Sequence, residues 1–150
     1  VNNKKWTIDS RGFEKRSLTS LPAWQTIMGF QFENLVLSNR NEIFKVLQIS
    51  VDDIVYDNPY FQKNTKRSDS CQIEYLIQTR FDTLYVFEIK FSKNLIRADI
   101  VKEMKEKISK LKIPRHTSCR AVLIHVNGVT EDLLDTRYFA NIIDFSSLLK

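Results

Sequence analysis

Residues 70–91 read SCQIEYLIQTRFDTLYVFEIKF, and this stretch decides the fold. Apolar and polar residues alternate over 70–79 and again over 84–91, which is the pattern of two half-buried strands. The short segment 80–83 between them predicts a tight turn. The sequence therefore predicts an antiparallel hairpin that folds about Phe81.

Two carboxylates are expected to face each other across this hairpin. A turn about Phe81 places Glu74 opposite Glu88, with their Cβ atoms roughly 5 Å apart on one face of the sheet. Lys90 lies two residues after Glu88 and therefore on the same face. Like charges placed directly opposite one another repel, so the arrangement indicates a site for a divalent cation. The alternative is a surface ion pair between Glu88 and Lys90 on an exposed sheet face.

Three motifs resemble those of a known family. They are Gly29–Val36 (GFQFENLV), Cys71–Ile77 (CQIEYLI) and Phe87–Ser92 (FEIKFS). A carboxylate on one strand and Glu-x-Lys on the next, behind a helix with a further glutamate, resemble the core of the PD-(D/E)XK nuclease superfamily. More narrowly, the stretch from Trp24 to the end of the chain resembles the nuclease-like C-terminal domain of archaeal-type AAA ATPases. Glu74 stands where that ATPase-linked family usually has aspartate.

The resemblance implies a restriction-endonuclease-like α/β fold, with a mixed central sheet flanked by helices, that hydrolyses phosphodiester bonds in DNA. It implies that Mg²⁺ or Mn²⁺ is held by Glu74, Glu88 and the backbone carbonyl of Ile89, because oxygen ligands suit these cations. Glu33 would complete or orient the ligand shell, and its alternative is an ordinary solvated position on a helix. Lys90 would hold the attacking water and stabilise the anionic transition state.

The charge of the chain favours an anionic partner. Its formal net charge is +5, which we interpret as a preference for DNA. The expected nucleic-acid contacts are Gln72, Lys63, Lys66, Arg67, Lys93 and Lys107. The alternative for the helical lysines is a solvated face, because Glu103 and Lys107 have the i,i+4 spacing of a helical ion pair.

One domain is expected, because 150 residues with 43% hydrophobic composition are enough to bury a single core. Residues 1–23 are interpreted as a lead-in segment from an upstream module, which the resemblance identifies as an ATPase. Residues 24–150 form the nuclease-like domain. No apolar run approaches the roughly 20 residues of a membrane span, so we expect a cytoplasmic protein without a membrane partner. A homo-oligomeric assembly is compatible with the sequence.

The remaining periodicities predict the order helix, strand, strand, strand, helix, strand. Helical spacing covers 24–47 with a break at 39–41, and the helix with the most regular apolar spacing covers 95–111. Further strands are predicted at 54–61, at 121–126 and from Ile142 onward. Pro59 in the first of them indicates an edge or a bulge, because proline has no N–H to donate.

Three functions compete for such a domain. The first is a metal-dependent deoxyribonuclease fused to an ATPase. The second is a related domain that binds DNA without cutting it, for which glutamate at position 74 is the main argument. The third is a protein-interaction module of the ATPase in which the acidic residues have no catalytic role.

Overall fold

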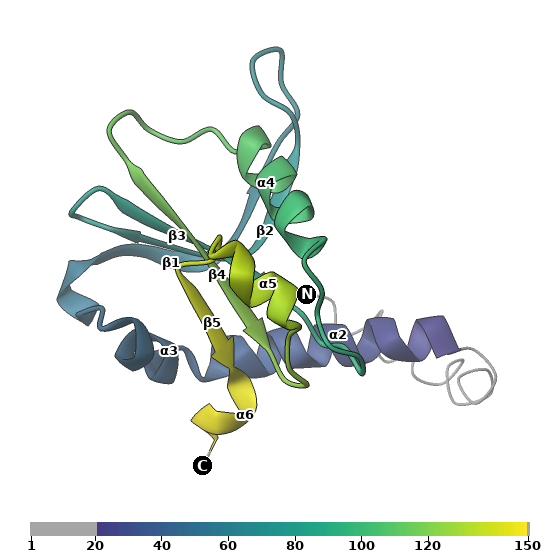
Figure 1. Cartoon of the computed structure of the whole chain (residues 1–150). Helices are drawn as coiled ribbons and strands as arrows, with labels where there is room; N and C mark the ends of the chain where they lie inside the picture. Colours follow the sequence, from purple (N-terminus) through teal and green to yellow (C-terminus); the bar gives the residue numbers. More distant parts are fainter. Residues whose placement is uncertain (1–20, 150) are drawn as a thin grey trace, which may run out of the picture.

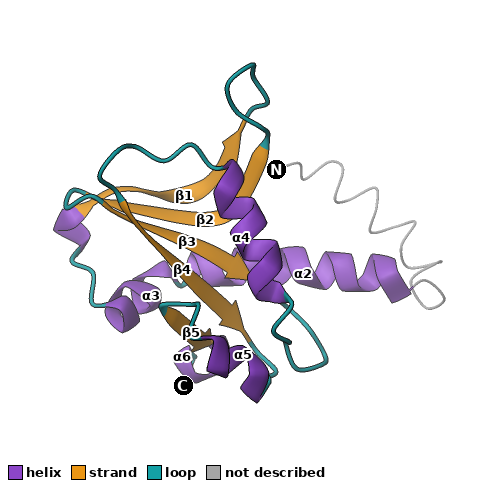
Figure 2. Cartoon of the chain, turned by 45° about the horizontal axis from the view of Figure 1, so that its top comes forward, coloured by secondary structure: helices purple, strands orange, loops and turns teal. Residues whose placement is uncertain are grey.

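The computed structural model describes residues 21–149, and within them the chain forms one five-stranded sheet with helices on both faces (Figures 1 and 2). The strands are β1 (Ile54–Gln62), β2 (Cys71–Thr79), β3 (Thr83–Ile89), β4 (Ser118–His125) and β5 (Asn141–Asp144). Their order in the sheet is the order in the sequence. β1, β2 and β3 pair antiparallel, whereas β4 and β5 are added in parallel. The expected α/β fold with a mixed sheet is confirmed.

The helices are α2 (Leu21–Ser38), α3 (Arg40–Leu47), α4 (Ile100–Lys110), α5 (Glu131–Thr136) and α6 (Phe145–Leu148), with a 3-10 turn at Val51–Asp53. Together with the strands they follow the order expected of a restriction-endonuclease-like core. Of the predicted lead-in, residues 1–20 lie outside the described residues, and residues 21–23 open α2. Among the helices of residues 21–149, none has the length and apolarity needed to cross a membrane.

The predicted hairpin is present with the predicted register. Thr79 pairs with Thr83 and Tyr75 with Phe87, which centres the turn on Phe81. The turn has three residues, and the last of them, Asp82, has a φ of 59°. Aspartate tolerates this left-handed conformation better than most residues, and three-residue hairpin loops commonly require it at this position.

Two hydrophobic cores lie on opposite faces of the sheet. One is covered by α2, α3 and α6, and it contains Phe32, Ile43 and Phe145 packed on odd-numbered residues of β3 such as Phe87. The other is covered by α4 and α5, and it contains Met104. The central strand β3 is buried almost throughout because both of its faces are covered, in agreement with its nearly continuous apolar sequence.

The helix predicted for residues 95–111 begins later, at Ile100. Ile96 is extended and forms an isolated parallel bridge with Val129, in which its N–H donates to Gly128 and its carbonyl accepts from Thr130. Ile96 is buried in the same core as Ile100, so its apolar side chain follows the helical spacing although its backbone does not. Tertiary hydrogen bonding has overridden the local pattern at this end.

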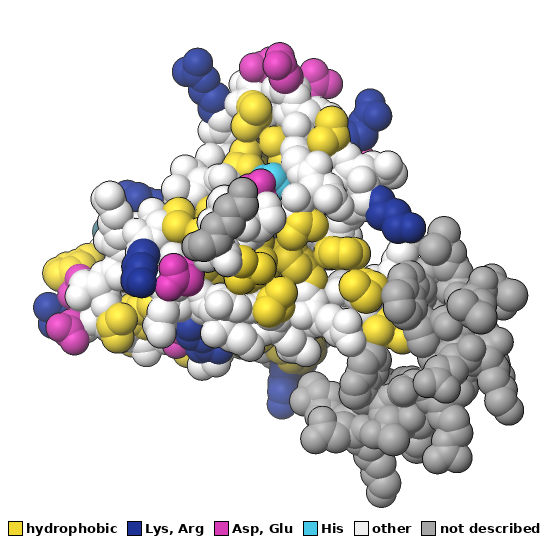
Figure 3. Space-filling view, turned by 90° about the horizontal axis from the view of Figure 1, so that it is seen from below, with side chains coloured by type: hydrophobic (Ala, Val, Ile, Leu, Met, Phe, Trp, Pro, Cys, Tyr) yellow, Lys and Arg dark blue, Asp and Glu magenta, His cyan; other side chains and the backbone are white. Residues whose placement is uncertain are grey.

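The helices carry large apolar side chains at the surface as well as in the core. Phe30 and Leu35 on α2 are 59% and 44% exposed, and Val46 on α3 is 42% exposed. Seen from below, hydrophobic side chains gather in the middle of the face, with charged side chains mainly toward its edges (Figure 3). Exposed apolar surface of this kind is a feature of interaction sites. The expected self-association stays a prediction.

Replacement of Phe87 by alanine is predicted to destabilise the fold strongly. Phe87 is fully buried on the central strand, so Phe87→Ala should lower the free energy of unfolding by about 3 to 5 kcal/mol. Phe81 is the matched control, because it is 65% exposed at the hairpin turn, and Phe81→Ala should cost about 1 kcal/mol or less. Urea denaturation of the two variants measures both values, and equal losses would contradict the assignment of β3 to the centre of the core.

Candidate functional site

The site lies where the ladder between β2 and β3 ends. Regular pairing stops at Tyr75 and Phe87, although both strands continue beyond this pair. The backbone N–H of Ile89 instead donates to the Glu74 carboxyl group, with 2.6 Å between the nitrogen and Oε1. The Glu74 side chain thus supplies the acceptor that the neighbouring strand no longer provides.

A β-bulge in β2 coincides with Glu74. Asn58 of β1 pairs with Leu76, whereas Tyr60 pairs with Ile73, so β2 has one more residue than β1 in this interval. Bulges are common next to active sites because they redirect a side chain. Here the bulge changes the direction of the strand at the residue that reaches across to β3.

The bulge also changes the face of the sheet toward which the side chains of β2 point. Ile73 belongs to the core beneath α4, whereas Tyr75 belongs to the core beneath α2, although residues two apart in a regular strand share a face. The Tyr75 hydroxyl donates to the Asp57 carboxylate over 3.0 Å, which holds the new orientation. Pro59 lies on the edge strand β1, opposite the bulge of β2, which agrees with the expectation of an edge or a bulge at this residue.

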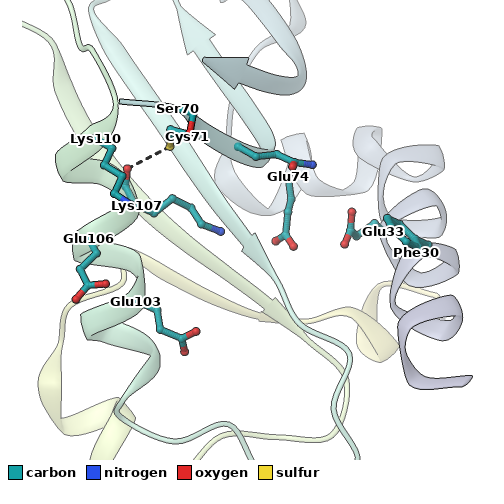
Figure 4. Close-up of a pocket in the computed structure, with 10 residues that line it drawn as sticks. Phe30, Glu33, Ser70, Cys71, Glu74, Glu103, Glu106, Lys107 and Lys110 are labelled. Carbon is teal, nitrogen blue, oxygen red and sulfur yellow. Dashed lines mark hydrogen bonds between the residues drawn. The ribbon is translucent and has the colours of Figure 1, made fainter. Parts of the chain in front are cut away.

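Four ionisable side chains from four elements meet at this point. Glu33 comes from α2, Glu74 from β2, Glu88 from β3 and Lys107 from α4. The Lys107 ammonium forms an ion pair with Glu88, with 2.8 Å between Nζ and Oε1, and the Glu88 side chain is only 8% exposed. The Glu33 and Glu74 side chains lie close enough for each to influence the pKa of the other. In Figure 4 they point toward one another, and Lys107 extends from α4 toward Glu74.

Crowding of carboxyl groups changes their affinity for protons. Burial, followed by the charge of the nearby Glu88, raises the pKa of Glu74 to about 8. The hydrogen bond from the Ile89 N–H lowers this pKa, but by less than Glu88 raises it. Burial and Glu88 also raise the pKa of Glu33. Burial lowers the pKa of Lys107, but the attraction of Glu88 and Glu74 outweighs this effect and the pKa is raised. At neutral pH Glu74 therefore holds a proton.

A cleft of about 530 Å³ opens onto this group. Its walls come from α2, from the start of β2 and from α4 (Figure 4). The lining residues are Phe30, Glu33, Ser70, Cys71, Gln72, Glu74, Glu103, Glu106, Lys107 and Lys110. Carboxylates and ammonium groups thus face the same opening. Such a cleft can bind a cation through oxygen ligands and can contact an anionic group through its lysines.

The donors of this group suit a hard cation, but they are engaged with one another. Carboxylate oxygens are the ligands that Mg²⁺ and Mn²⁺ prefer. Among residues 21–149, no group of three or more His, Cys, Asp or Glu side chains is arranged to hold a metal ion. A cation bound by Glu74 and Glu88 would have to replace the Lys107 ammonium and the Glu74 proton.

Comparison with known proteins gave one structural likeness. The crystal structure of a repair endonuclease from Pyrococcus abyssi is similar to this chain, with a TM-score of 0.46 and 17% sequence identity. The match covers 74% of this chain and 43% of the endonuclease chain, so this chain spans less than half of the other protein's length. No protein-family model matches the chain, and no curated protein matches it.

The structure brings together most of the expected metal site. Glu33 and Glu74 line the cleft, and Glu88 and Ile89 lie directly behind it, in contact with Lys107 and Glu74. That they bind a metal stays a prediction. Of the expected nucleic-acid contacts, Gln72 and Lys107 line the same cleft, and Lys66 and Arg67 line a second one. Lys63 and Lys93 line neither.

Lys90 differs most from its expected position. β3 ends at Ile89, and the N–H of Lys90 donates to the carbonyl of Ile124 on β4. Lys90 is not among the residues that line the cleft, and it is Lys107 that contacts Glu88. The expected role of Lys90 at the reacting water stays a prediction.

Sequence reasoning missed that α4 forms a wall of the cleft and that the exposed Phe30 lines it. Glu103, Lys107 and Lys110 follow one another at intervals of four and three residues, which places them on one helix face. That spacing is visible in the sequence, but it is equally typical of a solvated helix face. The exposed Phe30 gave no such signal, because aromatic residues in a helix are usually in the core.

The proton held by Glu74 predicts a dependence of stability on pH. Glu74 in the folded protein keeps its proton up to a pKa of about 8, whereas an unfolded glutamate loses it near about 4.3. Between these values the folded state binds more protons, so the free energy of unfolding should fall as the pH rises. The raised pKa of Glu33 acts in the same direction.

Chemical denaturation of the wild type, Glu74→Gln and Glu42→Gln over this pH range tests the assignment. Glu74→Gln should flatten the profile, because the neutral amide cannot titrate. Glu42→Gln should keep it, because the Glu42 side chain is 41% exposed on α3, away from the cleft. Parallel profiles for all three proteins would show that Glu74 is ionised in the folded state at neutral pH.

Proposed function

We propose that this chain is a metal-dependent DNA endonuclease domain of the PD-(D/E)XK type. The observation that carries the proposal is the meeting of Glu33, Glu74, Glu88 and Lys107 where β2 and β3 separate. Each comes from a different element, so only a specific tertiary arrangement brings them together. The motif resemblance supports the same assignment. We further propose that the domain is the C-terminal part of an AAA-type ATPase and acts on DNA presented with that module.

A cluster of buried carboxyl groups is costly to the fold, which supports a functional reason for it. Glu74 lies between Ile73 and Tyr75, which are both fully buried, and its raised pKa records the unfavourable burial of charge beside Glu88. Perturbed carboxyl groups that line a cleft are typical of active sites. Structural ion pairs perturb pKa values as well, but they do not require three carboxyl groups around one ammonium.

Glu74, Glu88 and the carbonyl of Ile89 are the proposed metal ligands, and Glu33, whose side chain points toward Glu74 in the cleft, would complete or orient the ligand shell. A bound Mg²⁺ or Mn²⁺ would polarise the phosphoryl group and make hydroxide available from water. Gln72 lines the cleft, and its side-chain amide can donate to a phosphate oxygen of a bound DNA strand.

Lys107 is the cation that we propose for the transition state. It extends from α4 into the cleft, where an ammonium group can neutralise the charge that develops on the phosphoryl oxygens. If Glu88 held a metal ion, the Lys107 ammonium would be free to contact the substrate. Lys90, the lysine of the Glu-x-Lys motif, remains the alternative for this role.

Binding of DNA without cleavage is the second candidate. The Lys107–Glu88 ion pair favours it, because an internal ammonium already neutralises a proposed metal ligand. Glutamate at position 74, one methylene longer than the aspartate usual in the related ATPase domains, favours it as well. Metal titration separates this candidate from the first.

Titration with Mn²⁺ tests the metal site directly. The wild type should bind Mn²⁺ and release protons on binding, because the Glu74 proton must leave. Glu88→Gln should abolish binding, and Glu42→Gln should leave it unchanged. Isothermal calorimetry in two buffers of different ionisation enthalpy measures both the affinity and the proton release. No binding by the wild type at millimolar Mn²⁺ would exclude the metal site and leave the second candidate.

Substitution of the two lysines distinguishes their roles. Lys107→Met should raise the affinity for Mn²⁺ several-fold, because Glu88 loses its competing ammonium, and yet it should lower the rate of DNA cleavage by about 100-fold or more. Lys90→Met should leave Mn²⁺ affinity unchanged and reduce cleavage less. If Lys90→Met abolishes cleavage and Lys107→Met does not, the motif lysine is the catalytic one.

A further inference from the structure

A second cleft, of about 560 Å³, lies beside the first, between the loop that joins β1 to β2 and the C-terminal end of α4. It is lined by Thr65, Lys66, Arg67, Ser68, Asp69, Ser109, Lys110, Leu111 and Lys112. Four of these residues are cationic and one is acidic. The cleft is therefore basic, whereas the first one is rich in carboxyl groups.

A single buried amide holds the two walls of this basic cleft together. The Gln62 side chain, with the residue 6% exposed, donates to the carbonyl of Asp69 in the loop and to that of Lys110 at the end of α4. Its oxygen accepts from the N–H of Lys112. The donor–acceptor distances are 2.7, 2.6 and 2.7 Å. The walls are thus fixed relative to one another rather than free to separate.

The loop is also structured from within. The Thr65 hydroxyl accepts from the N–H groups of Arg67 and Ser68, and the Thr65 N–H donates to the carbonyl of Ser68. These bonds define a turn that carries Lys66 and Arg67 at its tip. An ordered turn presents its cations at lower entropic cost than a flexible loop does.

The cations of the cleft are available to a ligand. Lys66, Arg67, Lys110 and Lys112 are exposed, and within residues 21–149 none of them forms an ion pair. Unpaired positive charges held close together repel one another, so binding of an anion between them is favoured. Several cations spaced along a cleft match a chain of phosphates better than a single small anion.

The two clefts share Lys110, which lines both. A strand whose reacting phosphate lies at the carboxyl cluster can therefore continue along α4 into the basic cleft. No acidic residue of the basic cleft other than Asp69 would oppose it. The nucleic-acid strand would therefore leave the carboxyl cluster along α4, toward the basic cleft.

We propose that the basic cleft is a phosphate-binding subsite for the nucleic-acid strand that flanks the reacting phosphate, with Gln62 as its positioning residue. The proposal rests on the proposed function, because the strand is taken to extend from the carboxyl cluster. Lys66, Arg67 and Lys112 contact the phosphates of the flanking nucleotides. Lys110 connects the subsite to the cleft in which cleavage occurs.

The experiment compares binding of a dinucleotide and of a long oligonucleotide in EDTA, so that no cleavage occurs. The test variant replaces Lys66, Arg67 and Lys112 together with alanine. The control variant replaces Arg97, Lys102 and Lys105 with alanine. It loses the same positive charge as the test variant, but these three residues line neither cleft. The test variant should bind the long oligonucleotide about tenfold or more weakly, and the slope of log affinity against log salt should flatten by roughly 2 to 3. The control variant should lose clearly less affinity, and its salt slope should flatten clearly less.

Gln62→Leu gives an independent test, because it keeps every cation. It should weaken binding of the long oligonucleotide several-fold and leave the dinucleotide unaffected, since only the longer ligand reaches the subsite. A melting measurement confirms that this variant is folded, and if it is not, the triple variant alone decides. Equal losses in the test and control triple variants would overturn the subsite.

Failure of the subsite is distinguishable from failure of the proposed function. If the wild type cleaves DNA in Mn²⁺ but the test and control variants bind alike, the subsite is wrong and the nuclease assignment stands. If the wild type never cleaves, but the test variant alone loses binding and salt dependence, the subsite stands as part of a DNA-binding domain.

Discussion

The hydrogen bond between the Ile89 N–H and the Glu74 carboxyl group is the interaction on which the site depends. It joins β2 to β3 beyond the last regular pair, and so it allows the two strands to stop pairing without leaving a buried donor unsatisfied. The bulge at Glu74 brings its side chain into position to accept that bond. Where the strands cease to pair, side chains from α2 and α4 can reach the carboxyl cluster.

Charge balance explains why the cluster is compatible with a stable fold. Three carboxyl groups in a partly buried place would repel one another strongly if all were ionised. Lys107 neutralises Glu88, and the proton on Glu74 removes a second charge. The same balance determines what a cation must do to bind: it has to substitute for an ammonium group, a proton or both. Without a cation, the cluster is expected to be more stable where Glu74 keeps its proton, below its pKa of about 8.

Helix α4 links this chemistry to the rest of the molecule. Its apolar face, with Ile100 and Met104, packs on the sheet, while Lys107 and Lys110 face the clefts. Its C-terminal end is tied to β1 and the following loop through Gln62. Because the helix is packed along its length, the two clefts on its surface keep a constant relation. A long anionic ligand can therefore be held at several points at once, which distinguishes this surface from a collection of independent lysines.

Several features could be predicted from the sequence because they depend on local patterns. Alternation over residues 70–91 predicts the hairpin and its turn at Phe81, and Pro59 predicts an edge strand or an irregularity where β1 pairs with β2. The spacing of Glu74 and Glu88 predicts two neighbouring carboxyl groups. The spacing of the apolar residues in α4 also predicts which face of this helix packs on the core. The helix itself starts at Ile100, because the backbone of Ile96 is hydrogen-bonded to a distant segment.

What the sequence by itself determined is thus the order of the elements and the approach of Glu74 to Glu88, since both follow from strand alternation and a short turn. Tertiary structure alone decided that Lys107 contacts Glu88, that Glu33 faces Glu74 and that Gln62 joins the loop to α4. These pairs are far apart in the chain. Their contacts depend on how helices pack on the sheet, and no local spacing encodes that packing.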